Sequence, residues 1–157
     1  MARLDLRQFI RATPERIWDV LSDLQNQKAW MVDLRRLEIT SEQHTGLGTK
    51  VDVTSELFGL PLLKDRMLIT GWEPPHRFDV KHVGSFSGTG AFILEAVPSG
   101  TVFTWIEDFQ PPLGPLGELG FSVLVGPHLR RVFRRSMDNV RRLAEAGHEH
   151  EPATAED

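Results

Sequence analysis

Residues 34–109 contain six short runs in which apolar and polar residues alternate, and this stretch constrains the fold more than any other part of the chain. Alternation with a period of two is typical of strands with one buried face. The runs are separated by short links, which join only antiparallel neighbours because parallel strands need a long crossover. Together with a further alternating run at residues 3–11, the pattern predicts seven antiparallel strands.

Helical signals lie between the first strand and the others. The sequence Thr13-Pro14-Glu15 predicts a helix start, because threonine caps, proline suits the first helical position and glutamate favours the positive end of a helix. A second short helix is expected to reach Lys28.

The last part of the chain predicts one long helix that runs to about Ala146 and is kinked or restarted at Pro127, since proline removes a backbone hydrogen bond. Its expected inner stripe consists of Phe121, Leu124, Val125, His128, Val132, Ser136, Val140 and Leu143. Its solvent side is expected to be covered mostly by Arg130, Arg131, Arg134, Arg135, Arg141 and Arg142. We expect residues 1–147 to form a single domain and residues 148–157 to form a disordered polar tail.

A bent seven-stranded sheet cannot bury one face alone, and the long helix has the only apolar stripe that can cover it. Such a helix fills only part of the space inside the bend, so the pattern predicts an internal cavity with mostly apolar walls. A void of several hundred Å³ would suit a small ligand. The expected wall residues are Trp30, Val53, Leu57, Met67, Ile69, Phe86, Phe92, Trp105, Glu107, Phe109, Phe121, Val125, His128 and Val132. For each of them alone, ordinary core packing is the alternative.

Glu107 is the most informative polar residue, because it shares a strand face with Phe103, Trp105 and Phe109. If that face points inward, burial would raise the pKa of the carboxyl group and suit it to proton transfer. Alternatively, Glu107 lies near the strand end and meets water or an arginine such as Arg131. Alternation alone does not decide between these placements.

Two further polar sites are open to more than one interpretation. His128 is either a polar contact for a ligand or a hydrogen-bonded histidine at the helix restart. Asp65-Arg66 precedes an apolar strand predicted at residues 65–72, where either a local ion pair forms or one of the two side chains faces inward.

Composition excludes several classes of function. Eighteen basic residues against 22 acidic ones give a formal charge of −4, whereas nucleic-acid binding usually needs a basic excess. The absence of cysteine excludes disulfides and thiolate metal sites. His148-Glu149-His150-Glu151 is interpreted as tail rather than as a metal site, and the glycine-rich turns precede strands rather than the helix that a phosphate loop needs. We therefore expect no metal or cofactor, no nucleic acid, no integral membrane segment and a cytoplasmic location.

Three stretches resemble a known family. They are the run from Ala12 to Leu21 followed by Trp30, the segment Trp72-Glu73-Pro74-Pro75-His76-Arg77-Phe78, and the run from Gly88 through Trp105 to the arginine-rich helix. They resemble the START-like (SRPBCC) superfamily and, within it, bacterial proteins named polyketide cyclase/dehydrase. The resemblance implies an α+β helix-grip fold like that of Bet v 1, with two short N-terminal helices, a seven-stranded curved antiparallel sheet and a long C-terminal helix over the sheet.

The superfamily includes lipid carriers, hormone receptors, co-chaperone-like proteins and aromatase/cyclases, so the resemblance allows three functions. The first is binding of a small hydrophobic or amphipathic, lipid- or polyketide-like ligand in the cavity. The second is a polyketide aromatase/cyclase or dehydratase that uses Glu107, His128 or both for proton transfer and meets an acyl carrier protein through the helix arginines. The third is a co-chaperone-like interaction module with a filled interior. The chain has no tyrosine and no complete cyclase catalytic set, which favours ligand binding by a monomer or homodimer.

Overall fold

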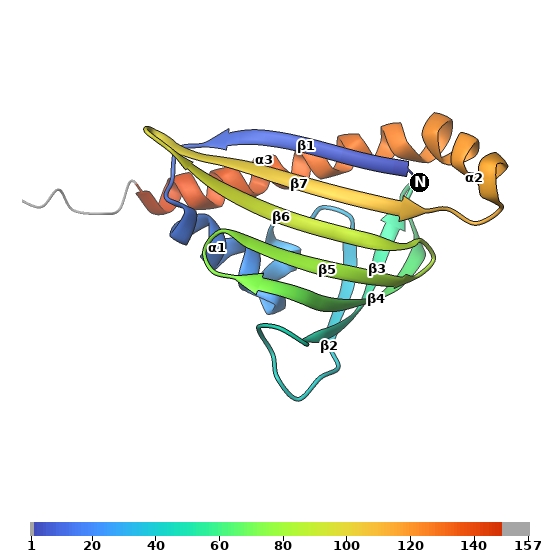
Figure 1. Ribbon diagram of the computed structural model, residues 1–157, viewed down its shortest axis with the longest axis horizontal. Helices are drawn as coiled ribbons and strands as arrows, with labels where there is room; N and C mark the ends of the chain where they lie inside the picture. The colour runs from blue at the N-terminus through green and yellow to red at the C-terminus, as the bar shows by residue number, and fades with distance from the viewer. Residues whose placement is uncertain (1, 149–157) are drawn as a thin grey trace, which may run out of the picture.

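The computed structural model describes residues 2–148, which form a curved sheet lying against one long helix (Figure 1). The strands are β1 (Ala2–Ile10), β2 (Leu34–Ile39), β3 (Lys50–Leu57), β4 (Leu60–Glu73), β5 (Arg77–Gly84), β6 (Ser87–Val97) and β7 (Gly100–Gln110). The helices are α1 (Pro14–Ser22), η1 (Leu24–Ala29), α2 (Gly114–Gly120), η2 (Phe121–Val125) and α3 (Gly126–His148). The predicted tail lies outside the described residues, apart from His148 at the end of α3.

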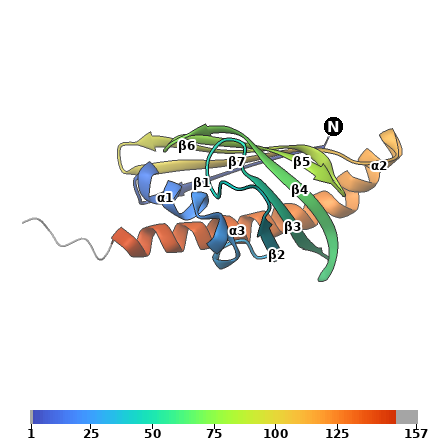
Figure 2. The same cartoon turned by 90° about the horizontal axis from the view of Figure 1, so that it is seen from below.

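All seven strands pair antiparallel in the order β1-β7-β6-β5-β4-β3-β2, as the short links predicted. The first strand therefore lies beside the last one, and the connection from β1 to β2 carries α1 and η1 across one end of the sheet. Figure 2 shows the sheet and α3 as two layers, with β3 and β4 bending toward the helix. This bend gives the sheet a concave face that looks onto α3.

The strand predicted at residues 65–72 is longer in the structure, where β4 begins at Leu60. A tight turn joins β3 to β4, because Leu57 pairs with Leu60. Phe58 and Gly59 in this turn have φ angles of 53° and 80°. Positive φ at both central residues is typical of two-residue hairpins, but such a turn seldom starts with phenylalanine. The early part of the strand was therefore missed.

The N-terminal helices form as the sequence predicted. The Thr13 side chain accepts a hydrogen bond from the Arg16 backbone N–H at 3.4 Å, and Pro14 takes the first helical position. The second helix, η1, is a 3₁₀ helix that ends at Ala29. The segment after it is tied to α3, because the Val32 N–H donates to Ser136 Oγ at 3.1 Å and Asn139 donates to the Trp30 carbonyl at 3.0 Å.

The prediction for the buried stripe of the last helix was partly wrong. Phe121, Ser136 and Val140 are buried as expected, whereas Leu124 and Leu143 are exposed. The stripe actually continues through Leu129, Phe133, Met137 and Ala144. The cause is η2, a π-helical turn just before α3, since each π turn contains more residues than an α turn and shifts the buried face along the sequence. Helical spacing counted from Phe121 therefore selects the wrong neighbours.

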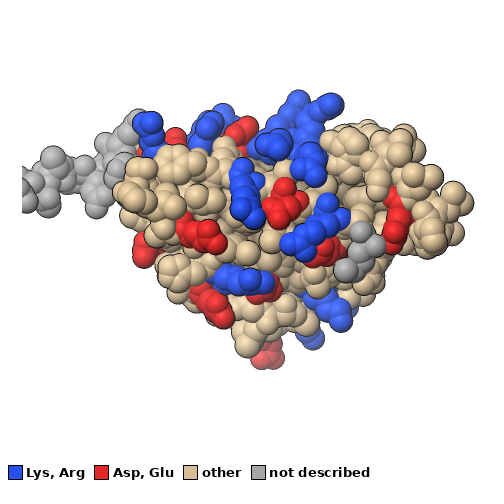
Figure 3. Space-filling model, turned by 45° about the horizontal axis from the view of Figure 1, so that its top comes forward, with Lys and Arg blue, Asp and Glu red and all other residues tan. Residues whose placement is uncertain are grey.

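Pro127 lies in the first turn of α3, directly after the π turn η2, and the chain continues as helix from α2 through η2 into α3, so the predicted restart is not observed. The helix α3 ends at His148 rather than near Ala146. The arginines of α3 lie on its outer side, and all except the half-buried Arg141 are exposed. Figure 3 shows basic residues gathered along the upper edge of the molecule, where α3 runs in Figure 1. Across residues 2–148, no helix is both long and apolar enough to cross a membrane.

Candidate ligand-binding site

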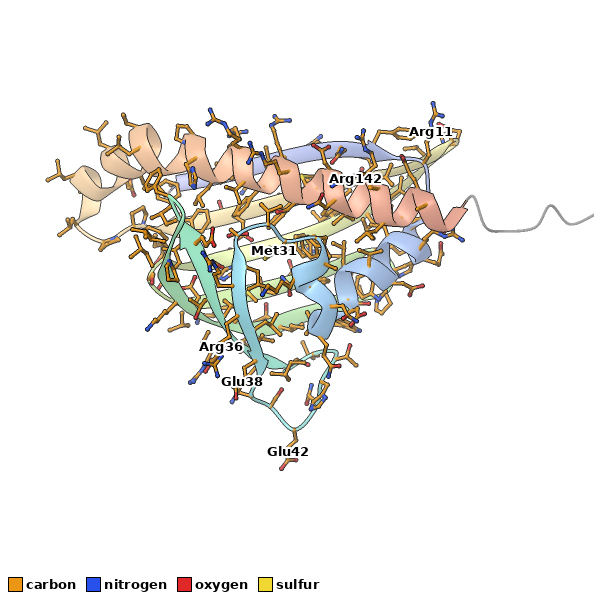
Figure 4. All side chains as sticks on the ribbon, turned by 180° about the vertical axis from the view of Figure 1, so that it is seen from behind. Arg11, Met31, Arg36, Glu38, Glu42 and Arg142 are labelled. Atoms are coloured by element: carbon orange, nitrogen blue, oxygen red, sulfur yellow. The ribbon has the colours of Figure 1, made fainter. Side chains whose placement is uncertain are left out.

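A cavity of about 90 Å³ lies between the concave face of the sheet and α3. It is lined by Leu24, Gln27, Met31, Asp33, Leu34, Val51, Val53, Ser55, Leu63, Asp65, Met67, Ile69, Phe78, Val80, His82, Phe86, Phe92, Trp105, Glu107, Phe109, Leu129 and Phe133. Figure 4 shows Met31 where the segment between η1 and β2 approaches α3. The cavity is smaller than the several hundred Å³ considered from the sequence, so in this form it suits only a compact ligand.

The structure places eight of the fourteen predicted wall residues in this lining: Val53, Met67, Ile69, Phe86, Phe92, Trp105, Glu107 and Phe109. The other six, which do not line it, are Trp30, Leu57, Phe121, Val125, His128 and Val132. Alternation along strands thus placed most of the sheet residues, whereas no predicted residue of the last helix lines the cavity.

The six remaining residues have structural roles or partly buried positions. Trp30 is 1% exposed and packs its ring against Phe92 and Trp105, each at 6.0 Å between ring centroids. Phe121 packs against Phe86 and Phe109, two residues of the cavity lining. Leu57, Val125 and Val132 are partly buried at the edge of the same core.

His128 points to the β3–β4 turn. Its ring lies 4.6 Å from that of Phe58, and its Nε2 accepts a hydrogen bond from the Phe58 backbone N–H at 3.4 Å. The π turn before α3 explains this placement, because it puts Leu129 rather than His128 on the inner stripe. Of the two interpretations left open, the hydrogen-bonded histidine matches the structure, although the helix continues through this point without a restart.

Glu107 faces inward and is 6% exposed. Its Oε1 accepts a hydrogen bond from Trp105 Nε1 at 2.8 Å, and its Oε2 lies 3.1 Å from Nε2 of His82. The two partners come from β7 itself and from β5, which is separated from β7 by β6. Phe103, Trp105, Glu107 and Phe109 are all buried, so the inward orientation of this strand face, one of the two alternatives, is the observed one.

His82 shares this buried environment. Burial by itself lowers the pKa of the imidazole, but the charge of Glu107, its hydrogen bond and the charge of Asp65 together raise the pKa above the ordinary 6.5. His82 and Glu107 therefore form an ion pair over a wider pH range than an isolated histidine would allow. A protonated imidazole beside a carboxylate is an arrangement that can donate or accept a proton within the cavity.

Gln27 of η1 and Asp33 in the segment after η1 also bring polar groups to the cavity. Asp33 is 8% exposed, and burial is the main reason why its pKa is raised to about 6; the charges of Glu56 and Glu107 act in the same direction. Its Oδ1 has no hydrogen-bond partner in the described part of the chain. Gln27 donates from Nε2 to Met31 Sδ at 3.4 Å, which leaves its buried Oε1 without a partner as well.

Asp65 faces the cavity from β4, while Arg66 points outward and binds Asp52 at 2.8 Å. The predicted ion pair between Asp65 and Arg66 was therefore wrong, and the inward alternative is observed for Asp65. Burial raises the pKa of Asp65, although His82 and two backbone hydrogen bonds oppose this effect. The Asp65 Oδ1 is buried and has no partner.

Sequence reasoning missed His82, Asp33 and Gln27 as site residues. A signal existed for His82, because it continues the alternation of Phe78 and Val80 on β5. No comparable signal existed for Gln27, which lies in η1, or for Asp33, which lies in the segment after it. Across the described residues, no group of three or more His, Cys, Asp or Glu side chains is arranged to hold a metal ion.

Comparison with known proteins gives the same architecture. The family model described as polyketide cyclase/dehydrase and lipid transport matches residues 1–145. The chain is also similar to the uncharacterized protein Rv2574 of Mycobacterium tuberculosis, with 30% identity over 141 residues that cover 85% of this chain and 79% of the relative.

Solved structures with the same fold include TTHA0849 from Thermus thermophilus. Its TM-score is 0.78 at 17% identity, with 93% of this chain and 99% of that one covered. The Zhui aromatase/cyclase from Streptomyces sp. R1128 has a TM-score of 0.72 at 14% identity, with 99% of both chains covered. At these identities the likeness concerns the fold alone, and it confirms the predicted helix-grip architecture.

Proposed function

The chain belongs to the polyketide cyclase/dehydrase and lipid transport family, and from this premise we propose that it binds a small hydrophobic or amphipathic molecule in the cavity between the sheet and α3. The observation that carries the proposal is the cavity itself, whose wall is mostly apolar with a few polar groups facing inward. Binding sites for small molecules share this composition, because apolar surface supplies affinity and a few polar groups fix orientation.

Aromatic packing supports a preformed site. Trp105 stacks on Phe133 of α3 with ring centroids 4.3 Å apart, and Phe92 contacts Trp105 edge to face at 5.0 Å. These contacts brace the sheet against the helix on one side of the cavity, so a ligand would meet walls that already have their final positions. An interaction module of the co-chaperone type, for which we expected a filled interior, is less consistent with this cavity.

The proposal is tested by filling the cavity. Met67→Trp places a larger side chain into the lining, whereas Leu68→Trp adds the same side chain at the next position of β4, outside the lining. Saturable binding of a hydrophobic dye, and any small molecule seen by native mass spectrometry after gentle purification, should persist in Leu68→Trp and be lost in Met67→Trp. Equal binding by the two variants, or no saturable binding by the natural sequence, would contradict the proposal.

A second candidate function is proton-transfer catalysis of the aromatase/cyclase or dehydratase kind. The observation that favours it is the His82–Glu107 pair at 3.1 Å inside the cavity, which replaces the pair of Glu107 and His128 considered from the sequence. In such a reaction the pair would move a proton at an activated carbon of a poly-β-carbonyl chain. The exposed arginines of α3 would then be the surface for an acidic acyl carrier protein.

Turnover of a poly-β-carbonyl substrate tests this second candidate. Glu107→Gln should lower turnover by about 10²–10⁴-fold if the carboxylate transfers the proton. The same loss is expected for His82→Asn, while His128→Asn, outside the cavity lining, should keep the activity. Unchanged turnover in Glu107→Gln would remove this residue from the mechanism.

A further inference from the structure

The polar side chains that line the cavity offer free hydrogen-bond acceptors. Three buried side-chain oxygens that line it, Gln27 Oε1, Asp33 Oδ1 and Asp65 Oδ1, have no hydrogen-bond partner among residues 2–148. Gln27 and Asp33 are only 4% and 8% exposed, so these groups have little access to bulk solvent. All three atoms are acceptors, and a buried acceptor without a partner is costly. These oxygens are therefore positioned to accept hydrogen bonds from a donor placed in the cavity.

The charged side chains that line the cavity also favour a ligand with a positively charged donor. Three carboxyl groups, those of Asp33, Asp65 and Glu107, face the cavity, and among the described residues His82 is the only basic side chain in its lining. The His82 Nε2 is already engaged by Glu107 at 3.1 Å. Even with His82 protonated, the lining sets three carboxyl groups against a single cation. In a mostly apolar space this excess acts on a bound charge more strongly than it would in water.

We propose that the ligand of this cavity is a compact apolar molecule that carries a protonated amine, which donates to the free oxygens of Asp33, Asp65 and Gln27. This inference rests on the proposed function, because it names the chemical class that the same cavity selects. An ammonium group supplies up to three N–H donors and no acceptor, so it matches a wall that offers acceptors alone. A carboxylate head group would meet like charges and no free donor.

The apolar part of the ligand is accommodated by the apolar side chains of the lining. Val53, Ile69 and Phe92 are each buried and line the cavity without polar side-chain atoms. The volume of about 90 Å³ limits the apolar body to a single ring or a short chain. Selectivity between head groups then comes from the carboxylates, and the common affinity comes from apolar contact.

Calorimetric titration at neutral pH with four probes of one hydrocarbon body tests the inference: phenethylamine, phenethyl alcohol, phenylacetate and ethylbenzene. We expect phenethylamine to bind at least about tenfold more tightly than phenylacetate, with the alcohol between them, since hydrogen bonds to charged groups are the stronger ones. Phenylacetate binding as tightly as the amine would overturn the inference and leave the proposed function standing. If none of the four bound while the natural sequence still bound the hydrophobic dye or a copurifying molecule in this cavity, the inference alone would fail.

Isosteric variants locate the selectivity. Asp33→Asn and Asp65→Asn should each lower the affinity for phenethylamine by about tenfold and leave ethylbenzene binding unchanged. Asp19→Asn, which removes the same charge from the exposed face of α1, is the matched control and should bind all probes as the natural sequence does. Circular dichroism melting confirms that each variant is folded. An amine preference that survives in both cavity variants would overturn the assignment.

Discussion

At the scale of single residues, the unusual feature is a buried carboxylate that has no cationic partner among the residues that the structure describes. Asp33 is 8% exposed, and the charges near it, those of Glu56 and Glu107, are also negative. Burial of an ionised group is unfavourable unless it is paired, so the folded protein holds the Asp33 proton more tightly than the unfolded chain does. Such a residue lowers the stability of the ligand-free protein, and its carboxyl group is available to pair with a ligand.

Asp33→Asn should therefore stabilise the protein at neutral pH. The pKa of Asp33 is raised from 3.8 to about 6, so the free energy of unfolding falls as pH rises through this window, by up to about 3 kcal/mol. The variant should gain about 1–3 kcal/mol at about pH 7 and nothing at about pH 4, measured by urea unfolding. Asp19→Asn should show no such difference, and a variant that is weakened equally at both pH values would contradict the explanation.

Glu107→Gln should lower the pKa of His82 below the ordinary 6.5. In the natural sequence the charge and hydrogen bond of Glu107 act together with the charge of Asp65 to outweigh burial, which is the largest single effect. Without the Glu107 charge, burial dominates. NMR titration of the His82 ring measures the shift directly.

The same titration fixes the sign of the effect on stability. A raised folded-state pKa stabilises the natural protein below about pH 6.5, and this contribution is lost as pH rises through the His82 pKa. Glu107→Gln should abolish this contribution. An unchanged His82 titration in the variant would mean that the pair does not form in solution.

At the scale of elements, the π turn η2 decides which face of α3 is buried. It begins at Phe121, which packs against Phe109 of β7, and it precedes Leu129, which lines the cavity. The turn accommodates both contacts on one continuous helical segment, because it changes the helical phase between them. Such turns are frequent at functional sites, and here the turn immediately precedes the helix that covers the cavity.

Two truncations in α3, one of a methionine and one of a leucine, test this helical register. Met137→Ala should cost about 2–5 kcal/mol of unfolding free energy, since Met137 is 2% exposed in the core. Leu143→Ala should cost less than about 1 kcal/mol, because Leu143 is 45% exposed although spacing from Phe121 predicts it to be buried. Chemical denaturation of both variants gives the comparison, and similar losses would indicate that the helix is rotated from this register.

At the scale of the whole molecule, ligand binding and folding are linked through the cavity. The walls come from η1, from six of the seven strands and from α3, so the cavity exists only when all these elements are assembled. A molecule that binds there binds the folded state alone and stabilises it by mass action.

Phenethylamine at about 100 times its dissociation constant should raise the free energy of unfolding by about 2.7 kcal/mol. Met67→Trp, which fills the cavity, should show no such increase, whereas Leu68→Trp should behave as the natural sequence does. Denaturant titrations with and without the amine measure the effect. A gain of the same size in Met67→Trp would place the amine elsewhere on the protein.

Strand alternation and short links determined the seven antiparallel strands, the capping signals at Thr13 determined the first helix, and the family motifs determined the helix-grip fold. These features depend on residues close together in the chain, so a sequence pattern can reveal them. Alternation also places Glu107 with Trp105 on one strand face, but it does not say whether that face is the concave one. Which face of the sheet is covered is decided by the packing of α3 against it.

Only the tertiary structure decided the polar content and the size of the cavity. His82 meets Glu107 across the intervening strand, Asp33 enters from the segment after η1, and the π turn exchanges His128 for Leu129 on the inner side of α3. These relations join residues that are distant in sequence or depend on a local change of helical phase. Periodicity describes the faces of single elements, whereas packing between elements determines which side chains meet in the interior and how much space remains there.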